Sequence, residues 1–128
     1  MVSMPVEQIG IYTIADLERE RERDDRLRWE LLDGELVMTP SPRPIHQDIV
    51  WELILQLAPT TPAGTRFFTA PLDVRLDEGN VLQPDLILVD EDAIEEEFIS
   101  AAPLLAIEIL SPSTRRRDLV TKLDILAR

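Results

Sequence analysis

Cysteine is absent from this sequence of 128 residues, which excludes disulfides and metal sites built from thiolates. No run of about 18 or more apolar residues is present, so a membrane span is not expected. The first residues, MVSMPVEQIG, lack a basic segment followed by an apolar one, and we therefore expect no signal peptide and a cytoplasmic protein. Gly-rich phosphate loops, HExxH and GxSxG motifs are also missing.

Single copies of two reactive residue types stand out against this background. His46 is the one histidine and Lys122 the one lysine of the chain. Hydrophobic residues make up 45% of the sequence and charged residues 30%, which is typical of a globular protein and too apolar for a disordered one. A chain of this length buries about two-thirds of its unfolded surface in one core, so we expect a single domain over residues 1–128.

The net charge of −12 argues against a general nucleic-acid binder, because affinity for nucleic acid comes largely from neutralising phosphates. The charge is unevenly distributed. Residues 111–128 hold five basic and two acidic side chains, so this segment is the basic end of an otherwise acidic chain. A local contact with a phosphate backbone is compatible with that distribution but is not required by it.

The first half of the chain predicts a helix, a hairpin and a second helix. Thr13 with Asp16 three residues later indicates a helix start, and its alternating charges favour a solvated surface helix. Asp33-Gly34 between two apolar arms predicts a hairpin over residues 28–38. Within it, Glu30 is either a cross-strand partner of an arginine or an accessory acid of a site.

Apolar residues at helical spacing follow Pro44 and predict an amphipathic helix that ends before Pro59 and Pro62. We expect its buried stripe to consist of Ile45, Ile49, Val50, Leu53, Ile54 and Leu57. His46 lies in the first turn of this helix. A lone histidine at such a position is more often structural or exposed than catalytic.

The second half predicts three strands and a helix. Residues 66–76 and 81–89 read as a hairpin with a turn at 77–80, and Pro84 removes one ladder donor from the second strand. Residues 90–103 form an acidic connection, and residues 104–110 predict a third strand. The last helix runs to residue 128, and its expected buried stripe is Leu119, Leu123 and Leu126.

The strands VLQPDLILV (81–89) and LLAIEIL (104–110) are apolar almost throughout, which is typical of strands buried on both faces. Each carries one carboxylate in its expected interior, Asp85 and Glu108. Burying a carboxylate is costly without a cation, and two carboxylates suit an oxygen-preferring ion such as Mg²⁺ or Mn²⁺. The alternative is a structural ion-pair network with partners among Arg66, Arg75 and Arg115–Arg117.

The order Pro84-Asp85, Glu108 and Lys122 resembles the PD-(D/E)XK nuclease superfamily. Three segments, RWELLDGELVMTPSPRPIHQ, QPDLILV and IEILSPSTRRRDLVTKLDILAR, resemble more closely the Uma family, described as restriction endonucleases, from Thr13 onward. The resemblance implies an α/β fold, with a restriction-endonuclease-like mixed sheet flanked by helices and an N-terminal helix and β-hairpin. It also implies hydrolysis of DNA phosphodiester bonds by metal-activated water.

Site roles follow from the same resemblance. Asp85 and Glu108 would bind the metal, Glu30 would be an accessory acid, and His46 and Gln83 would line the site. The superfamily lysine normally stands two residues after the second acid, where this chain has Leu110, so the role would have moved to Lys122. The exposed basic turn at Arg115 and Arg116 is a candidate phosphate contact.

Members of this family normally continue into a further strand and a tail, so we expect a C-terminally truncated domain that forms a homodimer. Two alternatives to the nuclease remain. One is a catalytically inactive nuclease-fold module that acts in dimerisation or protein interaction. The other is a regulator that binds nucleic acid without cutting it, which would need a continuous basic face that the sequence does not show.

Overall fold

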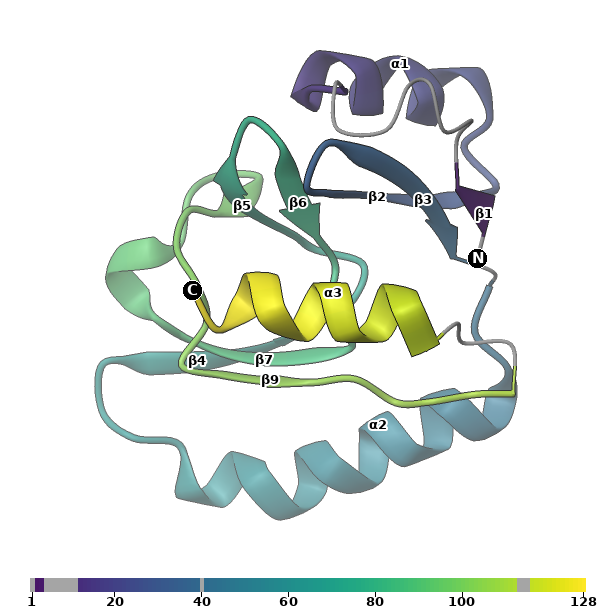
Figure 1. Ribbon diagram of the computed structural model, residues 1–128. Coiled ribbons are helices and arrows are strands. Elements are labelled where there is room, and N and C mark those ends of the chain that lie inside the picture. Colours follow the sequence, from purple (N-terminus) through teal and green to yellow (C-terminus); the bar gives the residue numbers. More distant parts are fainter. Residues whose placement is uncertain (1, 4–11, 40, 113–115) are drawn as a thin grey trace. The chain divides into compact units, whose positions relative to one another are not determined.

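A computed structural model describes residues 2–3, 12–39, 41–112 and 116–128 of the chain. Within these ranges the protein is a mixed α/β structure with three α-helices and two β-sheets (Figure 1). Its internal contacts divide it into two compact units. The first unit comprises residues 1–41, 75–82 and 112–128, and the second comprises residues 42–74 and 83–111.

The first unit is built around the hairpin of β2 (Arg28–Leu32) and β3 (Glu35–Thr39). Strand β1 (Val2–Ser3) pairs with β3, and β6 (Asn80–Leu82) pairs with β2, so the strand order is β1-β3-β2-β6, with β5 (Asp73–Asp77) next to β6. Helices α1 (Ile14–Arg23) and α3 (Arg116–Leu126) belong to the same unit.

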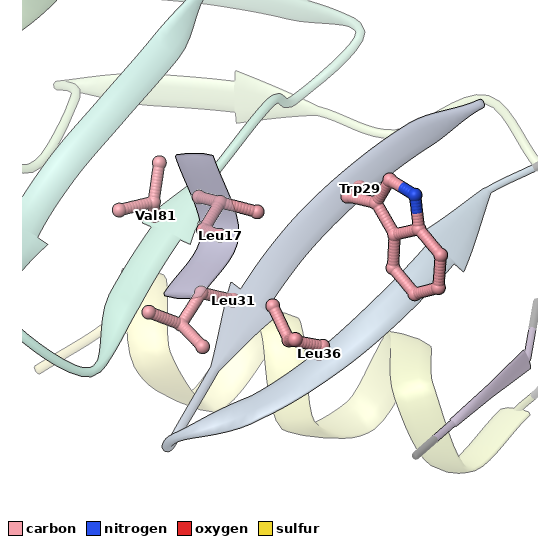
Figure 2. Packing of buried hydrophobic residues seen from close by; sticks show 5 residues of the cluster. All are labelled: Leu17, Trp29, Leu31, Leu36 and Val81. Carbon is pink, nitrogen blue, oxygen red and sulfur yellow. The ribbon is translucent and has the colours of Figure 1, made fainter. Parts of the chain in front are cut away.

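Successive side chains of a strand point to opposite faces of the sheet, and in this hairpin each face packs against a different helix. Leu17 of α1 packs with Trp29, Leu31, Leu36 and Val81 on one face, as Figure 2 shows. Ile125 of α3 packs with Leu32, Val37 and Leu82 on the other face. Because Glu30 lies between Trp29 and Leu31, its side chain is directed to the face that α3 covers, and it is buried there.

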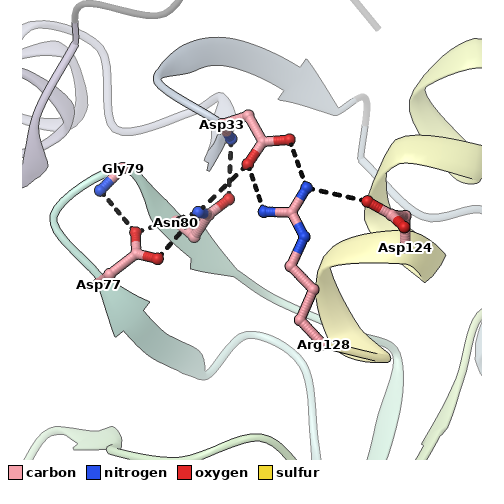
Figure 3. Close-up of polar contacts among 6 residues, drawn as sticks. All are labelled: Asp33, Asp77, Gly79, Asn80, Asp124 and Arg128. Atoms are coloured by element: carbon pink, nitrogen blue, oxygen red, sulfur yellow. Dashed lines mark hydrogen bonds and ion pairs between the residues drawn. The ribbon is translucent and has the colours of Figure 1, made fainter.

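The two turns of the first unit are joined by one polar network, drawn in Figure 3. Asp33 and Gly34 both have positive φ angles, 49° and 75°, as the predicted type I′ turn requires. The buried amide of Asn80 accepts a hydrogen bond from Asp33 N at 2.8 Å and donates to Asp77 at 3.0 Å. Arg128 then pairs with Asp33 at 2.8 Å and with Asp124 at 2.9 Å. Asn80 thereby fixes the position of one hairpin turn against the other.

The second unit contains an antiparallel sheet of β4 (Thr65–Thr69), β7 (Leu86–Asp90) and β9 (Leu105–Ile107), in the order β4-β7-β9. Helix α2 (Pro44–Leu57) lies along one face of this sheet (Figure 1). Strand β8 (Phe98–Ile99) pairs in parallel with Asp73 and Val74 at the start of β5. Short 3-10 helices at Ala58–Thr60 and Glu91–Ala93 complete the unit.

Proline breaks both arms of the hairpin that the sequence predicts over residues 66–89. The expected strand 66–76 is divided into β4 and β5 around Pro71, and the expected strand 81–89 into β6 and β7 around Pro84. A proline has no N–H to donate to the ladder, so pairing stops there and resumes with a different neighbour. Asp85 therefore precedes β7 instead of lying inside a strand, and the prediction of an interior position was wrong.

Three further expectations about burial were wrong. Strand β9 is short and lies at a sheet edge, so Leu104, Leu105 and Leu110 are exposed and Glu108 lies just after the strand. On α2, Ile45 and Ile49 are exposed, and only His46, Val50, Leu53, Ile54 and Leu57 are half-buried. On α3 the buried residues are Asp118, Lys122 and Ile125, whereas Leu123 is exposed. The other expected residues of the two helix stripes, Val50, Leu53, Ile54 and Leu57 on α2 and Leu119 and Leu126 on α3, are half-buried.

Strand β8 lies within the acidic segment that the sequence predicts to be a connection only. Among the described helices, none is long and apolar enough to cross a membrane.

Candidate active site

Asp85 and Glu108 each lie one residue beyond the same end of the ladder between β7 and β9. The last paired residues of that ladder are Leu86 and Ile107, and one further step along the same antiparallel register places Asp85 opposite Glu108. Residues that oppose each other in an antiparallel pair direct their side chains to the same face of the sheet. The register therefore brings together the two carboxylates that the sequence singled out, although neither lies inside a strand.

The carboxylate of Asp85 is buried and is held by two donors from its own unit. The ring Nε2 of His46, from the first turn of α2, lies 3.0 Å from Oδ1, and the backbone N–H of Ile109 donates to Oδ2 at 2.7 Å. A carboxylate accepts only, so Nε2 carries the proton in this contact. His46 is thus in contact with a predicted site residue, and its Nδ1 is buried without a hydrogen-bond partner.

This arrangement fits a hard divalent cation by the chemistry of its donors. Each oxygen of Asp85 engages one donor and retains a lone pair, and Glu108 adds a second carboxylate opposite it. Within the described ranges, no three carboxylate or imidazole groups form a complete ligand cage. Mg²⁺ commonly binds through one or two carboxylates and keeps several waters, so two carboxylates are sufficient for such an ion.

Glu30 and Lys122 form a buried ion pair in the first unit. Nζ of Lys122 lies 2.7 Å from Oε2 of Glu30, and the exposed fractions of the two side chains are 7% and 3%. Thr39 donates from its hydroxyl to the other oxygen of Glu30 at 3.3 Å. Glu30 therefore pairs with the one lysine of the chain, and its role as an accessory acid stays a prediction.

Asp118 is a buried polar residue that sequence reasoning missed. It is 4% exposed, its nearest cation is Arg117 at 3.7 Å, and its Oδ2 makes no hydrogen bond. Arg117 itself reaches Glu35 of β3 at 3.2 Å. The spacing of four residues between Asp118 and Lys122 was the available signal, because it places both side chains on one side of a helix.

The remaining predicted positions have different surroundings. Gln83 is half-buried and donates to Asp73 at 3.0 Å, and Arg116 is exposed at the start of α3. Arg115 lies outside the described residues. Arg66 pairs with Glu91 at 3.9 Å and Arg75 pairs with Glu18 at 3.6 Å.

Comparisons with known proteins agree with this fold. The model of the Uma2 family, described as "Putative restriction endonuclease", matches residues 14–128. A crystal structure of a putative nuclease belonging to DUF820 from Anabaena variabilis is similar, with a TM-score of 0.56 and 22% sequence identity over 77% of this chain. This chain spans 59% of the length of that protein. No curated protein matches.

Proposed function

This chain belongs to the Uma2 family, and we propose that it is a metal-dependent endonuclease that hydrolyses DNA phosphodiester bonds with metal-activated water. The observation that supports the proposal is the register of the β7–β9 ladder, which ends at Leu86 and Ile107 and, continued by one residue, sets Asp85 opposite Glu108. Two carboxylates on one face of a sheet, one of them buried and oriented by His46, supply oxygen ligands for Mg²⁺ or Mn²⁺.

Each residue has a distinct role in this proposal. Asp85 and Glu108 would hold the cation, which when bound lowers the pKa of water and stabilises charge on a phosphate. His46 and the N–H of Ile109 keep the carboxylate of Asp85 in one orientation. Lys122 contributes an ammonium that orients the attacking water and neutralises developing charge, and Glu30 holds that ammonium. We assign Lys122 and Glu30 to the same reaction from the order of these residues in the family pattern.

The proposed substrate is DNA, and the proposed location is the cytoplasm. Exposed Arg116 is the proposed phosphate contact, and Gln83 is a proposed site-lining residue. We also propose a homodimer, which is consistent with the large exposed side chains of Trp51 and Leu55 on α2 and of Leu104 and Leu110 beside β9. Light scattering coupled to size-exclusion chromatography tests it, and a mass of 14.6 kDa at micromolar concentration would refute the dimer.

The nuclease proposal is tested by incubating the purified chain with supercoiled plasmid in Mg²⁺ or Mn²⁺. Nicking or linearisation is expected for the wild type and should be lost in Asp85→Asn and Glu108→Gln. Asp90→Asn is the matched control, because Asp90 lies at the opposite end of β7 and is exposed. Isothermal calorimetry of Mg²⁺ on the same variants separates the alternatives. A folded wild type that neither binds Mg²⁺ nor cuts DNA would support the inactive interaction module instead.

A further inference from the structure

Asp118 is the buried charge that the proposed mechanism does not use. Its Oδ2 is shielded from solvent and makes no hydrogen bond with the described residues, and its carboxylate pairs with Arg117 at 3.7 Å. A buried carboxylate oxygen without a donor is costly, and such groups in folded proteins usually have a specific reason. Its place in the first turn of α3 favours a negative charge through the helix dipole, but the dipole does not explain the burial.

The position of Asp118 relative to Lys122 suggests that reason. The two residues are four apart on α3, both are buried, and side chains at this spacing are neighbours on a helix. Long helical side chains also lean toward the helix N-terminus, which is the direction of Asp118 from Lys122. The ammonium of Lys122 contacts Glu30 at 2.7 Å. Glu30 on β2 thus pairs with Lys122, and Asp118 lies one turn before Lys122 on the same side of α3.

We propose that Asp118 is a positioning residue for Lys122, a second carboxylate acceptor that holds the ammonium on the buried face of α3 when Glu30 releases it. The ammonium has three donors and can exchange between Glu30 on β2 and Asp118 on its own helix. This inference deepens the proposed function, since the catalytic role of Lys122 rests on that proposal. The proposed interaction between the two side chains, however, is testable without DNA, metal or activity.

Because Lys122 is the one lysine of the chain, lysine labelled with ¹⁵N and ¹³C gives a single side-chain ammonium signal by NMR. We would follow that signal against pH in the wild type, Asp118→Asn, Glu30→Gln and the double variant. The matched control is Asp124→Asn, which removes an exposed carboxylate of the same helix that pairs with Arg128. Backbone amide spectra confirm that each variant is folded.

In Asp118→Asn the titration midpoint of Lys122 should fall by about one unit, since a neighbouring carboxylate favours the charged amine. The double variant should show a larger fall than the two single changes combined, because both proposed carboxylate acceptors are then removed. Strict additivity in the double variant would overturn the exchange between two acceptors. A midpoint in Asp118→Asn no different from that in Asp124→Asn would overturn the proposal entirely. Neither result would bear on whether the wild type cuts DNA.

Discussion

His46 holds Asp85: its Nε2 lies 3.0 Å from the carboxylate oxygen Oδ1, while the N–H of Ile109 holds Oδ2. The two residues are far apart in sequence, one in the first turn of α2 and the other before β7. The pair therefore links the helix of the second unit to the end of its sheet. Its effect is to orient a carboxylate instead of merely neutralising it.

Replacing His46 tests that orienting role. His46→Ala removes the donor to Oδ1 of Asp85 and leaves both proposed metal ligands in the sequence, so Mg²⁺ affinity should fall by about 10- to 100-fold. Calorimetry with Mg²⁺ measures the change. Gln47→Ala is the control, because Gln47 is the next residue of α2 and is exposed. An unchanged dissociation constant in His46→Ala would show that Asp85 does not depend on this contact.

The buried pair of Glu30 and Lys122 predicts that removing one charge destabilises the protein more than removing both. Lys122→Met leaves Glu30 buried without its cation and should reduce the free energy of unfolding by about 3–5 kcal/mol. Combining it with Glu30→Leu should recover most of that loss, because no uncompensated charge remains. Urea unfolding followed by circular dichroism gives both values. Equal losses in the single and double variants would contradict the inferred dependence of each charge on the other.

The hydrogen bonds of Asn80 link the two turns of the first unit, and their removal should reduce the free energy of unfolding. Asn80→Ala removes the acceptor of Asp33 N and the donor to Asp77, and the part-buried N–H of Asp33 loses this acceptor. The free energy of unfolding should fall by about 1–3 kcal/mol. Glu78→Ala, in the same turn but exposed, should change it by less than about 0.5 kcal/mol. Chemical denaturation of the two variants under identical conditions provides the comparison.

The ion pair of Asp33 with Arg128 predicts a pH dependence of stability. The guanidinium of Arg128 lowers the pKa of Asp33, so the folded state favours the ionised carboxylate. This contribution is complete above the unfolded pKa, about 3.9, and is lost as pH falls through the lower folded value. Asp33→Asn tolerates the positive φ and removes the charge. Both side chains are about half exposed, so the loss at neutral pH should stay below about 1 kcal/mol.

Thermal unfolding of the wild type and Asp33→Asn between pH 7 and pH 2.5 measures this contribution. The difference in melting temperature should be largest at neutral pH and should close at the acidic end. Asp25→Asn serves as the control, because Asp25 is exposed between α1 and β2. A constant difference at every pH would attribute the effect of Asp33→Asn to the turn and not to its charge.

Local signals in the sequence were sufficient for most elements of the fold. Thr13 with Asp16 predicted the start of α1, and the backbone N–H of Thr13 donates to Asp16 at 2.8 Å. Asp33-Gly34 predicted the turn between β2 and β3. The family resemblance and its restriction-endonuclease-like fold are confirmed by the family match and by the similar crystal structure. The start of α1 and the turn between β2 and β3 depend on residues that are neighbours in the chain, which is why a single sequence reveals them.

Features that depend on distant segments could not be predicted in the same way. The partner of Asp85 is a histidine on another element, and nothing local to either residue indicates the pairing. On α3 the leucines predicted one buried stripe, whereas the sheet of the first unit covers Asp118, Lys122 and Ile125. Apolar periodicity predicts that a segment is a helix, but it does not show when charged residues lie on the buried side of that helix. The roles of Glu30, Gln83, Lys122 and Arg116 in the reaction stay predictions.

The pairing of Leu86 with Ile107 has a consequence for how this family can diverge. The ladder between β7 and β9 determines which residue lies opposite Asp85, so the segment between the two strands does not have to. That segment, residues 91–104, can gain or lose residues while the two carboxylates keep their relative position. A deletion of one residue inside either strand, in contrast, would turn one carboxylate to the opposite face of the sheet. We therefore expect relatives to vary in length within residues 91–104 and to keep the lengths of β7 and β9.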